Sequence, residues 1–301
     1  MSKDSKDAAV VPTEQEKEEQ EEVRTTLELL NLKEHPERLV ESFKVVTDAQ
    51  AQRRNLTNNV IIKNKLFISS FFLIAAFIVY RIRMRADSFG MDWGMLIMSL
   101  GGFGIAMFSI VGRYTEEIIA IAERMDIDEI FAPDVEAFSF IYKNLVVGTV
   151  AIKPPPDYKP GQEAVASALE KSTEAIAKMT DEEKKRYDEE RETKIKIYHK
   201  QPEGTAMLTA WTALRRYRGI GMGSDLLDKA IAVARDQFGA KAITALCEST
   251  EKPAIAVLKK KGFVLVDTKL TRGQRGKWFQ IKELTWKKVI EPTIKDKKAD
   301  S

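Results

Sequence analysis

The sequence predicts an α/β protein built on a mixed β-sheet, with a two-helix transmembrane hairpin in its N-terminal half. A β-prone run, Ala206–Leu214, turns through three glycines at alternate positions and continues as a helical pattern over Asp225–Arg235. Strand, glycine turn and helix form a local structure in which main-chain N–H groups at a helix N-terminus converge on an anion. Two long uncharged runs, 66–80 and 93–112, precede this region and predict the hairpin.

Composition argues against several classes of function. The 301 residues carry 48 basic and 45 acidic side chains, so the net charge of +3 does not indicate nucleic-acid binding. Cys247 is the single cysteine, which excludes an internal disulfide and favours a reducing compartment. His35 and His199 are the only histidines, so we expect no metal site. Neither histidine lies in a recognisable sequence setting for a Ser/His/Asp triad.

The first 60 residues hold a polar tail and two expected elements. Residues 1–22 are too polar and acidic to bury a core, so we expect a disordered tail, and they show no signal-peptide pattern. Residues 23–30 predict a strand. Apolar residues at helical spacing after Pro36 predict an amphipathic helix over 36–50, since proline is favoured at the first helical position. Residues 23–60 therefore supply a possible first strand and helix of the fold.

The hairpin is expected at 61–112, with spans at about 61–81 and 92–112. The uncharged run 93–112 would rise roughly 30 Å as a helix, the thickness of a bilayer core. The run 66–80 is apolar on all sides, unlike the one-faced helix of a soluble protein. The alternative is a buried helical hairpin in a large soluble core.

The basic residues around the spans predict the orientation of the hairpin. Six lie outside it and three in its connecting loop, so both termini are expected in the cytosol. The formal glycosylation sequon at Asn55 would then go unused. The six are Arg53, Arg54, Lys63, Lys65, Arg113 and Arg124, and the three are Arg81, Arg83 and Arg85.

Residues 113–290 alternate helix and strand patterns. Thr115 is expected to cap a helix, and Lys143-Asn144 to form a hairpin turn. A charged helical insertion is expected at 153–193 and a disordered tail at 291–301. The expected strands are 135–142, 145–152, 194–198, 206–214, 240–247, 263–266 and 278–286, and the expected helices are 115–126, 225–235 and 253–261.

The glycine turn and its neighbours resemble the GNAT acyltransferases. The acetyl-CoA motif of that family, R/Q-x-x-G-x-G/A, is matched from Arg218 to Gly223, and the helix 253–261 ends in a similar Lys260-Lys-Gly-Phe263. The hairpin around Val147-Gly-Thr149 is similar to the strand pair that precedes the motif. The resemblance covers about 135–290. A hydrophobic hairpin after the first strand and helix is similar to membrane-anchored GNAT enzymes of the endoplasmic reticulum.

The resemblance implies that acetyl-CoA is the co-substrate and that an amine attacks its thioester directly. Its pyrophosphate would bind the amides of 219–224, and an N–H of Ala213 or Leu214 would polarise the thioester carbonyl. The implied cofactor-binding residues are Ala213, Leu214, Arg218, Gly219, Ile220, Gly221, Met222, Gly223 and Ser224.

The sequence also departs from the family pattern. Leu258 stands where many members place a tyrosine that protonates the leaving thiolate, and Glu251 stands at an asparagine position. The strand 206–214 carries no carboxylate that would act as a base. The candidates for a catalytic side chain are Glu203, Glu248, Tyr198 and His199.

Two functions therefore stand at this stage. The first is a membrane-anchored, acetyl-CoA-dependent N-acetyltransferase that acts at the cytosolic face on an amine of a protein or small molecule. The resemblance implies that the membrane is that of the endoplasmic reticulum. The second is a catalytically weak or inactive GNAT-like membrane protein that binds or packages another membrane protein, for example as a transporter chaperone. The glycine motif favours the first, and Leu258 and Glu251 favour the second.

Overall fold

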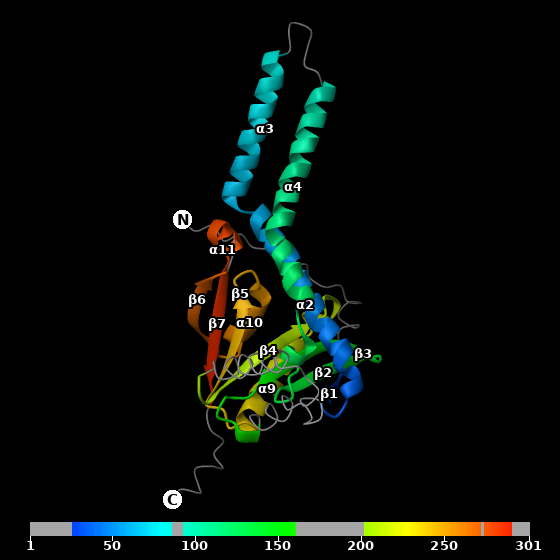
Figure 1. Ribbon diagram of the computed structural model, residues 1–301, viewed down its shortest axis with the longest axis vertical. Helices are drawn as coiled ribbons and strands as arrows, with labels where there is room; N and C mark the ends of the chain where they lie inside the picture. The colour runs from blue at the N-terminus through cyan, green and yellow to red at the C-terminus, as the bar shows by residue number, and fades with distance from the viewer. Residues whose placement is uncertain (1–25, 86–92, 161–201, 272–273, 291–301) are drawn as a thin grey trace, which may run out of the picture.

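The computed structural model describes residues 26–85, 93–160, 202–271 and 274–290. Their centre is a seven-stranded sheet in the order β1-β2-β3-β4-β5-β7-β6, in which only β4 and β5 pair in parallel (Figure 1). The predicted mixed α/β sheet is confirmed. The strands are β1 (Glu28–Asn31), β2 (Glu136–Tyr142), β3 (Leu145–Lys153), β4 (Thr205–Ala213), β5 (Ala242–Glu248), β6 (Val264–Leu270) and β7 (Lys282–Val289).

Helices cover both faces of the sheet and project from it. Neighbouring residues of β3 point to opposite faces, as in any strand: Val150 belongs to a core that contains α9 residues, whereas Ala151 packs in a second core that contains Val46 of α2. The helices are α2 (Leu39–Ile62), α3 (Lys65–Arg85), α4 (Trp93–Glu123), α5 (Ile127–Ile130), α9 (Met222–Asp236), α10 (Lys252–Lys260) and α11 (Gln274–Phe279), with 3₁₀ turns η1 (Pro36–Arg38) and η2 (Arg215–Tyr217).

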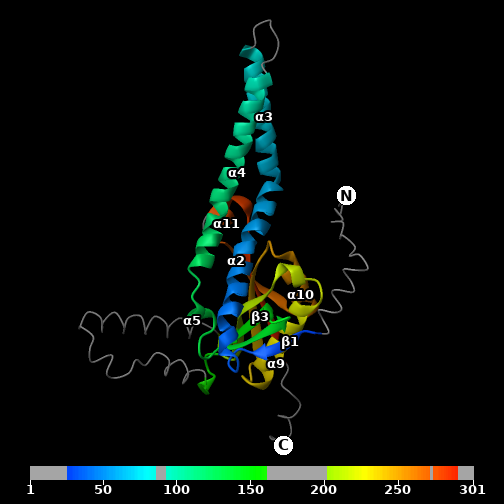
Figure 2. The same ribbon diagram turned by 90° about the vertical axis from the view of Figure 1, so that its right-hand side faces the viewer.

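The helices α3 and α4 form a hairpin that extends beyond the domain (Figures 1 and 2). They contact each other through the rings of Phe71 and Phe103, whose centroids are 5.2 Å apart. Both are long and apolar enough to cross a membrane, and only 6% and 11% of their most apolar stretches are buried. Phe72 and Met98, for example, are 66% and 80% exposed. The hairpin is therefore not a buried core of the described domain.

Two local predictions fail. Thr115 does not cap a new helix, because α4 continues without a break to Glu123 and the Thr115 hydroxyl donates to the carbonyls of Val111 and Gly112 inside it. The strand expected from Trp278 begins only at Lys282, since 274–279 form α11. Apolar aromatic residues suit a short helix packed on Tyr114 as well as they suit a strand.

Other predictions hold or lie outside the described residues. Lys143 and Asn144 have positive φ values of 47° and 67°, as expected for a two-residue hairpin turn. The N-terminal helix is longer than expected and reaches Ile62. The two tails, most of the insertion expected at 153–193, and the strand at 194–198 lie outside the part of the chain that the structure describes.

Gly148 on β3 sets the distance between the sheet and the start of α9. A Cβ at this position would lie 2.7 Å from the Met222 sulfur, 3.2 Å from Leu226 Cδ1 and 3.3 Å from the Thr212 carbonyl oxygen. Met222 and Leu226 are both buried. The first turn of α9 therefore lies against the sheet only because residue 148 has no side chain.

We predict that Gly148→Ala destabilises the protein by about 1–3 kcal/mol, the usual effect of overpacking a filled core. Thermal unfolding in detergent measures the change. Gly223→Ala is the matched control, because its Cβ would meet the Trp211 ring at an ordinary 3.8 Å and helical alanine is favoured over glycine. Equal stability of the Gly148→Ala and parent proteins would show that this contact is not limiting.

Candidate active site

The parallel strands β4 and β5 separate part-way along their length. They pair only over Thr205–Met207 and Ala242–Thr244, although β4 continues to Ala213 and β5 to Glu248. Beyond that point β4 is paired on its β3 side alone, and β5 on its β7 side alone. The two strands therefore enclose a V-shaped opening toward their C-terminal ends, lined by main-chain groups that the sheet leaves unpaired.

Ala213 presents its main-chain groups to this opening. The Leu214 N–H donates to the Val147 carbonyl at 2.8 Å, so Leu214 is a hydrogen-bonded position of the β3–β4 ladder. Hydrogen-bonded and non-hydrogen-bonded residues alternate along an antiparallel ladder, so the next residue, Ala213, directs its N–H and C=O away from β3 and toward β5. The Ala213 carbonyl accepts from Arg218 Nε at 2.8 Å. Of the two candidate N–H donors, the one on Ala213 faces the opening.

The glycine turn adopts the geometry that its composition predicts. Gly219 and Gly221 have φ values of 95° and 96°, a conformation that side-chain-bearing residues rarely adopt. The Gly221 carbonyl accepts from the N–H groups of Ser224 and Asp225, at 2.8 and 3.2 Å, and so begins α9. No side chain caps the helix.

An uncapped helix start leaves its first N–H groups without intrahelical acceptors. In α9 these groups belong to Met222 and Gly223, at the positive end of the helix dipole. The Trp211 indole Nε1 donates to the Gly223 carbonyl at 2.8 Å and fixes this end of the helix on β4. The turn is therefore a rigid cluster of open donors that suits a phosphate.

Arg218 places a cation between the glycine turn and α2. Its guanidinium also donates to the Gln52 side-chain oxygen at 3.2 Å. Desolvation lowers the pKa of Arg218, and the nearby Glu251 carboxylate partly opposes this shift. A guanidinium stays charged at neutral pH. The candidate anion site thus combines main-chain donors with one fixed positive charge.

A second contact from α2 reaches the other side of the opening. Arg53 forms an ion pair with one oxygen of Glu251 at 3.0 Å, and the other oxygen accepts from the Glu248 N–H at 2.8 Å. This role was not predicted, because Arg53 was expected only to flank the hairpin as a charge. Nothing in the sequence indicates contacts between residues so far apart in the chain.

The candidate catalytic residues fall in different places. Glu248 ends β5 at the open side, where its carboxylate accepts from the Thr250 hydroxyl. Glu203 precedes β4 at the opposite, paired end of the strands. Leu258 is fully buried in the core. Tyr198 and His199 lie outside the described residues. Glu248 is therefore the candidate that the structure brings to the opening, and Glu251 joins it there.

An open cavity of about 410 Å³ adjoins the same end of β5. Three segments line it: the last two turns of α2, the β5–α10 connection and the α11–β7 connection. The lining residues are Leu56, Asn59, Val60, Lys63, Ser249, Thr250, Lys252, Phe279, Gln280 and Ile281.

Comparison with known families identifies the fold. The model of the acetyltransferase (GNAT) family matches residues 107–263, more than half of the chain. The chain belongs to the GNAT family. The match includes α9, the open strands and all of α10, so the resemblance that the glycine motif indicates is confirmed. No curated protein sequence matches the chain.

Solved GNAT structures are similar at low identity. A GNAT acetyltransferase from Streptococcus pneumoniae is 15% identical, with 59% of this chain and 77% of that one covered and a TM-score of 0.34. A putative streptothricin acetyltransferase from Bacillus anthracis, in complex with acetyl coenzyme A, is 13% identical, with coverage of 56% and 70% and a TM-score of 0.35. The ribosomal-protein-alanine N-acetyltransferase of Brucella melitensis is 15% identical, with coverage of 55% and 79% and a TM-score of 0.34.

Acetyl-CoA is the co-substrate of the GNAT acetyltransferase family, and the site in this GNAT chain fits it. The uncapped start of α9 and Arg218 suit the pyrophosphate. The unpaired edge of β4, with Ala213 at its end, suits the amide-bearing arm that ends in the thioester. GNAT membership supports acetyl transfer in general.

Cys247, on β5 beside this site, is predicted to be chemically inert in the folded protein. Desolvation, followed by the nearby Glu251 carboxylate, raises the pKa of its thiol to about 11, and the residue is buried. The thiol therefore stays protonated at neutral pH, and alkylation should be on the order of 100-fold slower than in the unfolded chain. Mass spectrometry after timed iodoacetamide treatment measures this, and rapid labelling of the folded protein would contradict it.

Proposed function

We propose that this GNAT protein is a membrane-anchored N-acetyltransferase that transfers the acetyl group of acetyl-CoA directly to an amine at the cytosolic face. The observation that carries the proposal is the open anion site at the start of α9 beside the separated strands β4 and β5. Acetyl transfer follows from the family, and the amine acceptor and the membrane placement are our inference.

In this mechanism the main-chain N–H groups of 219–223 and Arg218 hold the pyrophosphate, since the Ser224 N–H is used by the Gly221 carbonyl. The Ala213 N–H donates to the thioester carbonyl oxygen and stabilises the negative charge that develops there. For this step the Arg218 side chain leaves the Ala213 carbonyl, which is then free to accept from the amide-bearing arm of the bound molecule.

The acceptor nitrogen forms a C–N bond to the acetyl carbon as the C–S bond breaks. A lysine-type amine titrates near pH 10.4, so its ammonium form must lose a proton before attack. Glu248 is the candidate to take this proton, directly or through water, since it ends β5 at the opening. The nitrogen loses its second proton to water as the C–N bond forms, and the departing thiolate takes a proton from solvent, because Leu258 is apolar and fully buried. A thiolate of modest basicity is able to leave without an acid.

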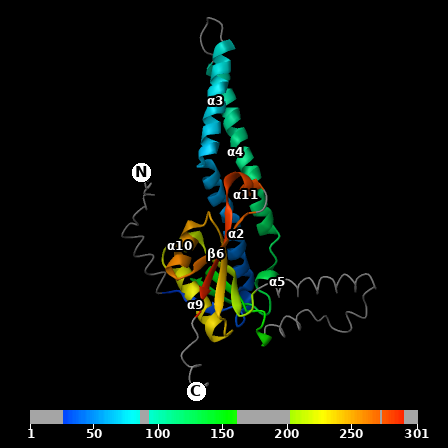
Figure 3. The ribbon, with the colours of Figure 1, turned by 90° about the vertical axis from the view of Figure 1, so that its left-hand side faces the viewer.

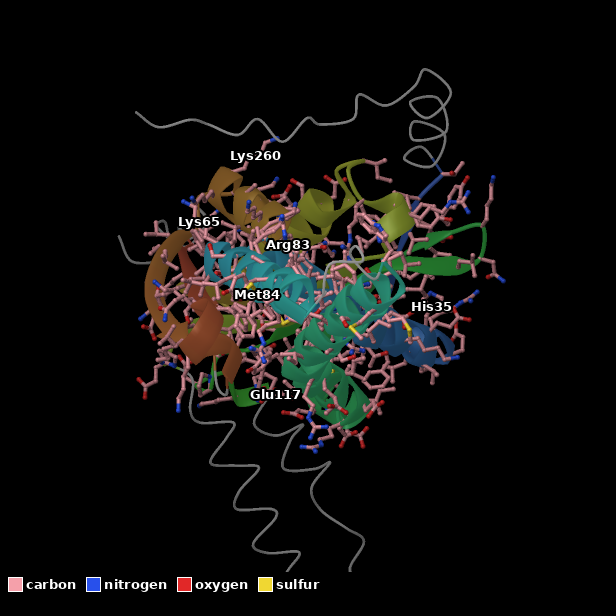
Figure 4. The ribbon with its side chains drawn as sticks, turned by 90° about the horizontal axis from the view of Figure 1, so that it is seen from above. His35, Lys65, Arg83, Met84, Glu117 and Lys260 are labelled. Carbon is pink, nitrogen blue, oxygen red and sulfur yellow. The ribbon has the colours of Figure 1, made fainter. Side chains whose placement is uncertain are left out.

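The hairpin supports the membrane placement. Its two helices are long and apolar enough to span a bilayer, and most of their side chains are exposed in the described structure. Figure 4 looks along the hairpin and marks Lys65 and Met84 near the two ends of α3. Exposed apolar patches of this size mark a membrane or partner surface. The endoplasmic reticulum is proposed from resemblance alone.

A binding or packaging factor remains the second candidate function. It is favoured by Leu258, which supplies no acid, and by Glu251, whose two oxygens are both engaged by Arg53 and the Glu248 N–H. Release of free thiol from acetyl-CoA in the presence of an amine panel separates the two functions. Binding without release would support the factor and contradict the enzyme.

Gly221→Asp is predicted to abolish acetyl-CoA binding. It adds a negative charge at the anion site and a side chain at a φ of 96°. Isothermal calorimetry on the detergent-solubilised protein measures the loss. Gly239→Asp is the matched control, since it adds the same charge at another positive-φ glycine, beyond the far end of α9. Equal loss in both variants, or none in Gly221→Asp, would contradict the phosphate site.

Cysteine labelling tests the proposed topology. In a Cys247→Ala background, Lys260→Cys on the outward-pointing face of α10 (Figure 4) should react with a bulky maleimide in sealed microsomes. Ser88→Cys, between the two spans, should react only after the membrane is permeabilised. Resistance of the full chain to alkaline carbonate extraction checks the anchoring itself. Labelling of Ser88→Cys in sealed vesicles would overturn the orientation.

A further inference from the structure

The cavity beside the active-site opening has a lining suited to an anion. Two lysines line it, Lys63 from the end of α2 and Lys252 from the start of α10. Among the residues that the structure describes, no carboxylate lines the cavity and neither lysine is in an ion pair. Two cations that face one space without a counter-charge favour the entry of an anion.

Other donors at this cavity remain available. The Ser249 hydroxyl oxygen accepts from the Lys282 N–H at 3.0 Å, which leaves the Ser249 proton free to donate. Asn59, which carries an amide side chain, is also among the lining residues. The two lysine ammonium groups, together with a hydroxyl and an amide, are hydrogen-bond donors that match the acceptor oxygens of a phosphate.

The cavity lies near the ends of both candidate membrane spans. Lys63 lies two residues before α3 begins at Lys65, where the first candidate span starts. On the opposite wall, the Phe279 ring contacts the Tyr114 ring with centroids 5.7 Å apart. Tyr114 comes two residues after the uncharged run of α4 ends at Gly112. Figures 1 and 3 accordingly show α11 beside the base of the hairpin.

We infer that this cavity binds the phosphate of an anionic phospholipid headgroup from the leaflet that faces the domain. The inference rests on the membrane placement proposed above. Lysines at this depth extend toward headgroups, and the cytosolic leaflet carries the anionic lipids. The apolar wall from Val60 and Phe279 provides a surface for the first carbons of the lipid. A volume of about 410 Å³ is sufficient for a headgroup.

The bound lipid would stand next to the catalytic opening. Thr250 and Lys252, which line the cavity, flank Glu251 in the chain, and Glu251 bonds to Glu248 and to Arg53. The headgroup would therefore form part of the wall between the membrane and the acceptor side of the site. An acceptor amine would approach along the membrane surface.

Calorimetry with short-chain lipids tests the site on the full-length protein in detergent. Dihexanoyl phosphatidic acid is expected to bind, and Lys63→Gln/Lys252→Gln to weaken that binding at least 10-fold. The control is Lys44→Gln/Lys260→Gln, which removes the same charge from exposed positions of the same two helices. Unchanged affinity in the cavity variant, or equal loss in the control, overturns the proposal.

Two further arms identify the source of the phosphate. Dihexanoyl phosphatidylcholine is expected to bind at least 10-fold more weakly, and inorganic phosphate not to compete. Equal binding of phosphatidylcholine, or competition by inorganic phosphate, excludes an anionic lipid site. Release of the protein by carbonate would instead show that the membrane placement fails. None of these measurements depends on acetyl transfer, so the outcomes are distinguishable.

Discussion

The separation of β4 from β5 is the constraint on which the rest of the site depends. Parallel strands that pair along their whole length satisfy each other's main-chain groups, whereas these two stop pairing after Met207 and Thr244. The sheet remains continuous because β3 and β7 hold the two strands from outside. The divergence costs main-chain hydrogen bonds and gains a surface of open donors and acceptors. Arg218, which donates to the Ala213 carbonyl, satisfies part of this surface.

The start of α9 is fixed by contacts that leave its N–H groups free. Gly148 permits Met222 and Leu226 to pack directly on the sheet, and Trp211 holds the Gly223 carbonyl. Both contacts use side chains or carbonyls on the sheet side of the helix. The N–H groups at its first turn point along the helix axis instead, so packing and anion binding do not compete for the same atoms.

Sequence patterns predicted what is local and missed what is distant. The glycine turn, the hairpin turn at Lys143-Asn144 and the helices flanking β5 have signals within a few residues, and the structure confirms them. The N-cap predicted at Thr115 is wrong, because a threonine inside a long helix can donate to the preceding turn and has the same sequence context as a cap. The contacts of Gln52 with Arg218 and of Arg53 with Glu251 come from tertiary packing of α2, which no local pattern encodes.

The helix α2 links the hairpin to the candidate active site. Arg54 donates to the Gly112 carbonyl and the Thr115 hydroxyl of α4, while its neighbours Gln52 and Arg53 contact Arg218 and Glu251. These three residues lie on one turn of a continuous helix that is separated from α3 by only two residues. A change in the tilt of the hairpin would thus act on both sides of the opening through a single rigid element. Two of the six charges that flank the candidate spans, Arg53 and Arg54, therefore serve the geometry of the site, since they form these contacts.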